Sequence, residues 1–262
     1  MKLEIITEKP SSPSHSNSLL FIHGMCQTAR VWQDNCIPFF VKHGYVCHAI
    51  NLRGHGKSET DKRFNLCTLK DYTKDVEQAI KQIGENTIII GHSMGGLVTQ
   101  LYLQSHKIPG AVLLSPIPPS GMLNFFLRYV KTNFLCTLKI IANLKVLHAL
   151  NSKEKLRRLL FRRETPEKVI EDFLLWLQDE SYLVFIQCLL TRLKRPPLNK
   201  TPLLIIGGTS DYLFTVKEYE YTGRFYETKV VFLEGMPHHT VCDHEWQITA
   251  NHILTWLHDK EL

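Results

Sequence analysis

The 262-residue sequence lacks several patterns that would assign it to a metal, nucleic-acid or membrane protein. It has no Cys-x-x-Cys spacing and no His-Glu-x-x-His, although it contains 13 histidines. No apolar run reaches the length of a transmembrane helix. No internal repeat, low-complexity tract or nucleic-acid-binding motif is present. These absences favour an ordinary globular domain, and no metal site is expected.

An export signal and a disulfide framework are also missing. The first residues carry Glu4 where a signal peptide would be apolar. The seven cysteines are odd in number, and several lie within apolar runs. We therefore expect free, buried thiols in a reducing compartment, and a cytoplasmic protein.

The net charge of +6 is partly concentrated in one short stretch. Its cations are Lys153, Lys155, Arg157, Arg158, Arg162 and Arg163. We interpret this stretch as a solvated helix face and expect no nucleic-acid partner, since no matching motif accompanies the charge. A weak association with anionic membrane surfaces is the alternative role for these cations.

Short apolar runs alternate with longer helical patterns along most of the chain. Helical spacing of apolar residues is clearest over 68–83 and 245–258. This alternation predicts an α/β fold with a mostly parallel central sheet and helices on both faces. The strand-like runs are 3–7, 19–23, 45–52, 87–90, 111–115, 203–207 and 229–233.

The alternation is interrupted between residues 118 and 197, where only helices are predicted. One helix lies within 122–150, a second begins with Thr165 as its N-cap and Pro166 in its first turn, and a third begins near Ser181. Residues 194–197 end the insertion. We therefore expect a core formed by 1–117 and 198–262, and a helical domain formed by 118–197.

A candidate nucleophile follows the most apolar strand. Residues 87–90 lead into Gly91-His92-Ser93-Met94-Gly95, and a helical pattern follows. A serine on so sharp a strand-to-helix turn has strained backbone geometry, and the two glycines leave room for it. A phosphate-binding turn would instead need Gly-x-Gly-x-x-Gly or a Lys-Ser/Thr ending, and this turn has neither. The pattern favours catalysis by Ser93.

These residues resemble the α/β-hydrolase superfamily, particularly its monoacylglycerol lipase, lysophospholipase and carboxylesterase-like members. The shared motifs are Gly-His-Ser-Met-Gly-Gly at 91–96, an apolar strand ending in His-Gly at 21–24, and Arg-Gly-His-Gly-x-Ser at 53–58. They keep the family order, and the similarity covers nearly the whole chain outside 118–197. The resemblance implies that the insertion forms a cap over an active site. It leaves the substrate open, because one fold serves many functions.

The resemblance also implies partners for Ser93, in the order nucleophile, acid, base. Asp211 follows an apolar strand and a small-residue turn, as the family's acid does. His238 lies in Gly-Met-Pro-His after the last strand, where the family has its base, and His239 is the competing histidine. The expected oxyanion hole consists of the backbone N–H groups of Met94 and Met25.

These features predict a serine hydrolase of the carboxylesterase or lipase type, which forms an acyl-enzyme on Ser93 and needs no cofactor. The cap is rich in large apolar residues, which favours a small lipophilic acyl ester such as a monoacylglycerol or lysophospholipid. The same triad could instead cleave thioesters, amides or C–C bonds, or transfer acyl groups. A non-enzymatic small-molecule receptor is the remaining alternative, and the oligomeric state stays open.

Overall fold

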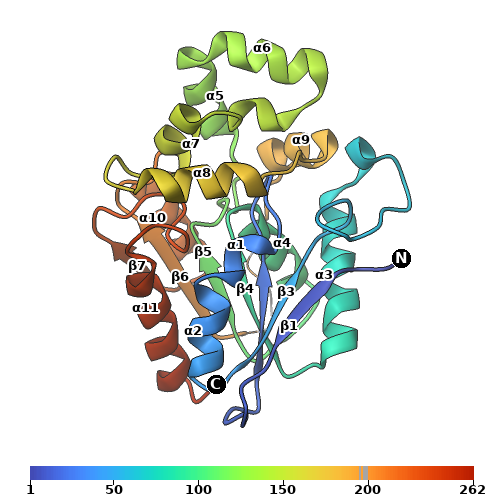
Figure 1. Ribbon diagram of the computed structural model, residues 1–262, viewed down its shortest axis with the longest axis vertical. Coiled ribbons are helices and arrows are strands. Elements are labelled where there is room, and N and C mark those ends of the chain that lie inside the picture. Colours follow the sequence, from blue (N-terminus) through green and yellow to red (C-terminus); the bar gives the residue numbers. More distant parts are fainter. Residues whose placement is uncertain (195, 197–199) are drawn as a thin grey trace.

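A computed structural model of the chain describes residues 1–194, 196 and 200–262. Its centre is a seven-stranded sheet with the order β1-β3-β2-β4-β5-β6-β7 (Figure 1). The strands are β1 (Ile5–Glu8), β2 (Ser18–Ile22), β3 (Val46–Ile50), β4 (Thr87–His92), β5 (Ala111–Leu114), β6 (Leu203–Gly208) and β7 (Val230–Leu233). All seven expected strands are confirmed, with small shifts at their ends.

The sheet is parallel except at one edge, as predicted. β1 pairs antiparallel with β3, with Ile5 opposite Ile50, and all other neighbours are parallel. All six residues of β4 are buried. This burial explains the uninterrupted isoleucines, because a central parallel strand is covered by helices on both faces.

Helices cover both faces of this sheet. On one face α2 (Cys36–Lys42) packs against α11 (Trp246–Asp259), and the short α1 (Arg30–Gln33) adjoins α2. On the other, α3 (Leu69–Ile83) packs against α4 (Met94–Leu103), and α10 (Val216–Phe225) packs on β6 and β7. A 3-10 turn, η1 (Phe64–Leu66), precedes α3. The helices expected at 68–83 and 245–258 are thereby confirmed.

Helices of residues 118–197 lie together above the ends of the strands, at the top of Figure 1. They are α5 (Leu123–Thr132), α6 (Phe134–Asn143), η2 (Val146–Ala149), α7 (Lys153–Leu160), α8 (Glu167–Trp176) and α9 (Tyr182–Leu190). Within the described part of this segment no strand occurs, as expected. The predicted end of the insertion at 194–197 includes residues 195 and 197, which lie outside the described residues.

Two local predictions within the insertion are corrected by the structure. The region 122–150 forms two helices and a 3-10 turn, because the chain bends at Asn133 between α5 and α6. Thr165 is not the N-cap of α8, since Pro166 occupies that position. The Thr165 hydroxyl instead donates to a carboxylate oxygen of Asp243, 2.6 Å away. By contrast, α9 begins next to Ser181 as predicted, and the Ser181 side chain caps it.

The cysteines carry no disulfide. All seven are free, six of them buried and Cys136 partly so, which confirms the expected free thiols. Among the helices of the described residues, none combines the length and apolarity that a membrane crossing requires.

Candidate active site

Ser93 lies in the turn between β4 and α4. Its φ and ψ of 52° and −112° fall in a region that non-glycine residues rarely adopt. A Cβ atom on Gly91 would come within 2.5 Å of the Gly95 carbonyl oxygen, and one on Gly95 would overlap the Ile22 carbonyl. Both positions therefore require glycine, as the sequence pattern indicated.

Asp211 follows β6 and is held by several donors. One carboxylate oxygen accepts the backbone N–H groups of Leu213 at 2.6 Å and Phe214 at 3.0 Å. The other accepts Nδ1–H of His238 at 2.7 Å and the buried hydroxyl of Tyr219. These four bonds orient the carboxylate toward the imidazole of His238.

Tyr219 is a contributor that the sequence did not indicate. It stands on α10, and a Cβ on Gly207 would come within 2.7 Å of its ring, so glycine makes room for it. A side chain on Gly208 would likewise overlap the Met236 carbonyl in the loop that carries His238. The paired glycines before Asp211 were the only available signal of this close packing.

The two adjacent histidines have different surroundings. His238 bonds to Asp211 and lines the same cavity as Ser93. His239 is fully buried between Phe161 and Phe173. Its Nε2 atom lies 3.3 Å from the side-chain oxygen Oε1 of Gln27. Burial, followed by the neighbouring His238, lowers the pKa of His239 to about 3. His239 is thus neutral near pH 7 and has no carboxylate partner.

His92 supports the loop that carries His238. Its Nε2–H donates to the His238 backbone carbonyl at 3.2 Å, and its ring is fully buried. Burial, together with the nearby histidines 239 and 238, lowers the pKa of His92 well below its usual value. The side chain between Gly91 and Ser93 therefore acts as a neutral donor to the loop.

Ser93 and His238 border an apolar cavity beneath the helices of 118–197. The cavity encloses about 740 Å³ including its open mouth. Among the described residues that line this cavity, none is Asp or Glu. The lining residues of the core are Met25, Cys26, Gln27, Ser93, Ile117, Leu213, Phe214 and His238; those of the insertion are Met122, Phe125, Phe126, Tyr129, Ile140, Val146, Ala149, Leu150, Leu159, Leu160 and Phe185.

Of the two residues expected to supply oxyanion donors, Met94 directly follows Ser93 and Met25 lines the same cavity. Met94 is the first residue of α4, so its N–H belongs to the unpaired first turn of that helix. Met25 lines the cavity with Ser93, in the loop after β2. Gln27 accepts the Gly24 N–H at 3.2 Å and so steadies that loop.

The histidines of the two other family motifs lie outside the cavity lining. His23 accepts the Leu52 N–H at Nε2 and donates from Nδ1 to the Gly24 carbonyl. Burial, followed by His55, lowers its pKa to about 3. His55 is fully buried with Nε2 3.5 Å from a carboxylate oxygen of Glu180. Both histidines therefore bond within loops and not at the cavity.

Glu180, in the insertion just before α9, is a second contributor that the sequence did not indicate. Its buried carboxylate accepts Tyr72 O–H at 2.5 Å, the Ser181 N–H at 2.8 Å and the Cys26 N–H at 3.4 Å. Burial alone would raise the pKa of Glu180, but His55 and these donors hold it below its usual value. Burial alone would lower the pKa of His55, but Glu180 raises it. The ion pair ties the insertion to the loop after β3, and the Cys26 bond ties it to the loop containing Met25.

We expect Glu180→Gln to lower the free energy of unfolding by about 3 kcal/mol, because it removes a buried carboxylate that pairs with His55 and accepts bonds from Tyr72 and two backbone N–H groups. Urea unfolding at pH 7 would measure the loss. Glu164→Gln, an exposed change in the same insertion, is the matched control and should stay within about 0.5 kcal/mol of the wild type. Equal stability of both variants would refute the ion pair.

The loop after His238 is also bonded to the insertion. The His239 N–H donates to the Leu160 carbonyl at 2.9 Å. Arg162, just beyond α7, contacts the buried Asp243 carboxylate at 2.8 Å, and Thr165 donates to the same carboxylate. The loop is thereby held between the core and the helices above it.

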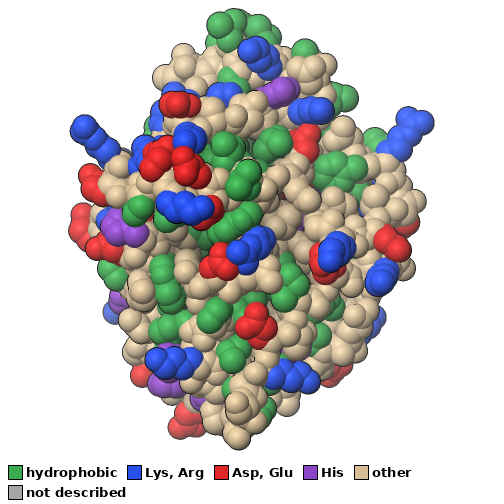
Figure 2. Space-filling view, in the orientation of Figure 1, with side chains coloured by type: hydrophobic (Ala, Val, Ile, Leu, Met, Phe, Trp, Pro, Cys, Tyr) green, Lys and Arg blue, Asp and Glu red, His purple; other side chains and the backbone are tan. Residues whose placement is uncertain are grey.

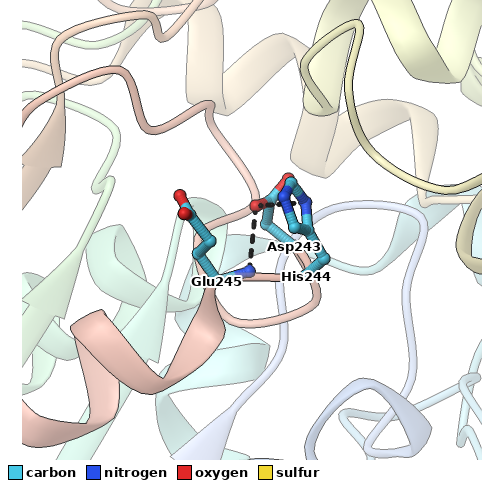
Figure 3. A group of neighbouring side chains, drawn as sticks. All are labelled: Asp243, His244 and Glu245. Carbon is cyan, nitrogen blue, oxygen red and sulfur yellow. Dashed lines mark hydrogen bonds and ion pairs between the residues drawn. The ribbon is translucent and has the colours of Figure 1, made fainter.

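Asp243, His244 and Glu245 form a cluster with the donor types of a metal site (Figure 3). Figure 3 shows His244 Nδ1 and the Glu245 backbone nitrogen both directed at the Asp243 carboxylate, at 3.2 Å each. Both oxygens of Asp243 already accept from Arg162 or Thr165. We therefore infer that the cluster stabilises the loop through these bonds.

Solved structures share this fold. A monoacylglycerol lipase from Paleococcus ferrophilus superposes with a TM-score of 0.70 over 99% of this chain and 100% of its own, at 19% identity. At that identity the likeness concerns the fold alone.

Sequence relatives match a shorter region. The non-heme chloroperoxidase of Streptomyces lividans is 31% identical over 115 residues, and the bifunctional esterase/perhydrolase DCH of Acinetobacter calcoaceticus is 29% identical over 115 residues. Each alignment covers 42% of this chain, which thus spans about two fifths (41%) of each relative.

The model of one protein family matches far more of the chain. The family is described as serine aminopeptidase, S33 (Hydrolase_4), and the match extends over residues 13–244. With the seven-stranded sheet and the Ser93 turn described above, this match establishes that the chain belongs to that family of α/β hydrolases.

Proposed function

We propose that the protein hydrolyses carboxylic esters of lipophilic acyl groups through an acyl-enzyme on Ser93. The proposal rests on the cavity, whose lining is apolar apart from a few residues that include Ser93 and His238. His238 is in turn hydrogen-bonded to Asp211. In this proposal residues 118–197 are the cap, and 1–117 with 198–262 are the core. The seven free cysteines support a cytoplasmic setting.

The first half-reaction begins with the ester carbonyl against Ser93. Ser93 Oγ attacks the carbonyl carbon while Nε2 of His238 takes its proton. The backbone N–H groups of Met25 and Met94 donate to the resulting oxyanion. The C–O bond of the ester then breaks, and the imidazolium returns the proton to the departing alcohol.

The second half-reaction repeats these steps with water. Water attacks the acyl carbon while His238 takes a proton from that water molecule. The imidazolium of His238 then returns the proton to Ser93 Oγ, and the carboxylic acid leaves. Asp211 accepts Nδ1–H throughout, which keeps Nε2 free as the base and stabilises the imidazolium. No cofactor takes part.

The cavity lining supports an uncharged lipophilic substrate. An aminopeptidase must bind the charged amino terminus of a peptide, for which a carboxylate is the ordinary partner. The described lining contains no Asp or Glu, and its insertion residues are mainly Leu, Ile, Val, Ala, Met and Phe. An apolar wall of this kind binds an acyl chain, and it favours ester over peptide hydrolysis.

A fluorophosphonate probe is expected to label the wild-type protein, because it reacts with an activated serine and mimics an acyl donor. Ser93→Ala should remove all labelling. Ser105→Ala, which changes an exposed serine beyond the end of α4, is the matched control and should label fully. In-gel fluorescence followed by peptide mapping measures both the extent and the position of labelling.

A folded wild-type protein that the probe leaves unlabelled would contradict the proposal and favour a ligand receptor. A panel of p-nitrophenyl esters, matching thioesters and aminoacyl p-nitroanilides then tests the substrate class. We expect ester turnover to increase with acyl length because each added methylene contacts the cavity wall. Faster turnover of the aminoacyl anilides would overturn the ester assignment.

A further inference from the structure

Helix α6 presents a row of large apolar side chains to solvent. Phe134, Leu135, Leu138 and Ile141 recur at helical spacing on its outer side, and Leu135 is 73% exposed. Leu127 on α5, which packs against α6, and Leu144 directly after α6 are exposed as well. We call this set the α6 face: Leu127, Phe134, Leu135, Leu138, Ile141 and Leu144, each at least 45% exposed.

The opposite side of the same helix faces inward. Thr137 and Ile140 are buried, and Ile140 lines the cavity that contains Ser93. The inner side therefore accounts for packing, and the α6 face contributes nothing to the core of the fold. Contiguous exposed apolar surface of this kind is uncommon on a soluble domain and marks a contact surface.

The charged residues of α5, α6 and the turn after them have one sign. The sequence has no Asp or Glu between Glu85 and Glu154. Lys131, Lys139 and Lys145 lie exposed on and beside α6. Figure 2 shows green hydrophobic and blue basic side chains together at this end of the molecule, over α6 in Figure 1.

The basic stretch at 153–163 differs from this surface. Lys153 contacts Glu171 at 2.6 Å, Arg157 contacts Glu167 at 2.8 Å, and Arg162 contacts Asp243. Three of its six cations are thus paired with acids of the fold. The surface that combines exposed apolar side chains with unbalanced lysines is α6.

We propose that the α6 face docks on the surface of an anionic lipid bilayer. Apolar side chains flanked by lysines match the acyl boundary and the negative headgroups of such a surface. A second copy of the chain is the poorer occupant, since two such faces in symmetric contact would bring their lysines together. Docking would place the bilayer against the helix whose inner side lines the cavity.

The test uses the full chain and vesicles of phosphatidylcholine, with or without phosphatidylserine. We expect the wild type to sediment with the mixed vesicles and to be released by high salt. Leu135→Ser/Leu138→Ser/Ile141→Ser should lower the partition coefficient by about tenfold or more, and Lys139→Gln/Lys145→Gln should lower it on mixed vesicles only.

Matched controls remove equally exposed side chains elsewhere. Leu175→Ser/Leu190→Ser and Lys42→Gln/Lys260→Gln should bind as the wild type does. All variants should hydrolyse a short water-soluble ester at the wild-type rate, which separates docking from the proposed activity. The proposal is overturned if the wild type stays in the supernatant, if the triple variant binds equally, or if light scattering shows a dimer that the triple variant abolishes without any lipid binding.

Discussion

His238→Gln is expected to lower kcat for a short p-nitrophenyl ester by about 10⁵-fold or more, because the variant has no group that can take the Ser93 proton. Glutamine keeps a polar side chain of similar reach but is not basic. The measurement is steady-state hydrolysis at pH 7.5 with active protein quantified independently. Circular dichroism and thermal unfolding verify that the variant is folded.

His239→Gln is the matched comparison at the adjacent position. His239 is neutral, faces Gln27 and two phenylalanines, and has no bond to Asp211. We expect its replacement to cost at most about tenfold in kcat, through altered packing of the loop. A loss in His239→Gln equal to that in His238→Gln would contradict the assignment of the base.

Asp211→Asn is expected to lower kcat by about 10⁴-fold. The asparagine carbonyl can still accept from the Leu213 and Phe214 N–H groups, which turns its NH₂ group toward His238. That donor faces Nδ1 and favours the tautomer whose proton is on Nε2, so the imidazole cannot accept the Ser93 proton. The pH dependence of kcat would also change, since the imidazolium loses its counter-charge.

Asp34→Asn provides the control for this substitution. Asp34 is exposed and paired with Arg30 on the surface, so its change should leave kcat within about twofold of the wild type. A folded Asp211→Asn protein with wild-type kcat would show that another acid orients His238.

The sequence predicted the parts of the molecule that depend on local patterns. The isoleucines of β4, Gly91 and Gly95 each follow from the needs of one strand and one turn. The order of the strands and the spacing of Ser93, Asp211 and His238 came from a resemblance to a known family. The candidate site is therefore predicted by local chemistry together with that resemblance.

Contacts between distant segments could not be predicted in this way. Tyr72 and Glu180 are 108 residues apart, and neither has a neighbour in sequence that indicates their bond. Thr165 has the residue type and position of an N-cap, but the buried Asp243 carboxylate takes its hydroxyl. Tertiary packing overrode local propensity there, and the bend at Asn133 is likewise set by the surfaces on which α5 and α6 pack.

The bonds from Leu160 and Arg162 to the loop after His238 couple the insertion to the proposed base. A cap that swings away from the core must break the His239 N–H bond to Leu160 and the contact of Arg162 with Asp243. Both bonds steady the segment that begins with His238. In the proposed mechanism, any movement of residues 118–197 away from the core would therefore loosen the segment that positions His238, so opening of the cavity and alignment of the proposed base are coupled.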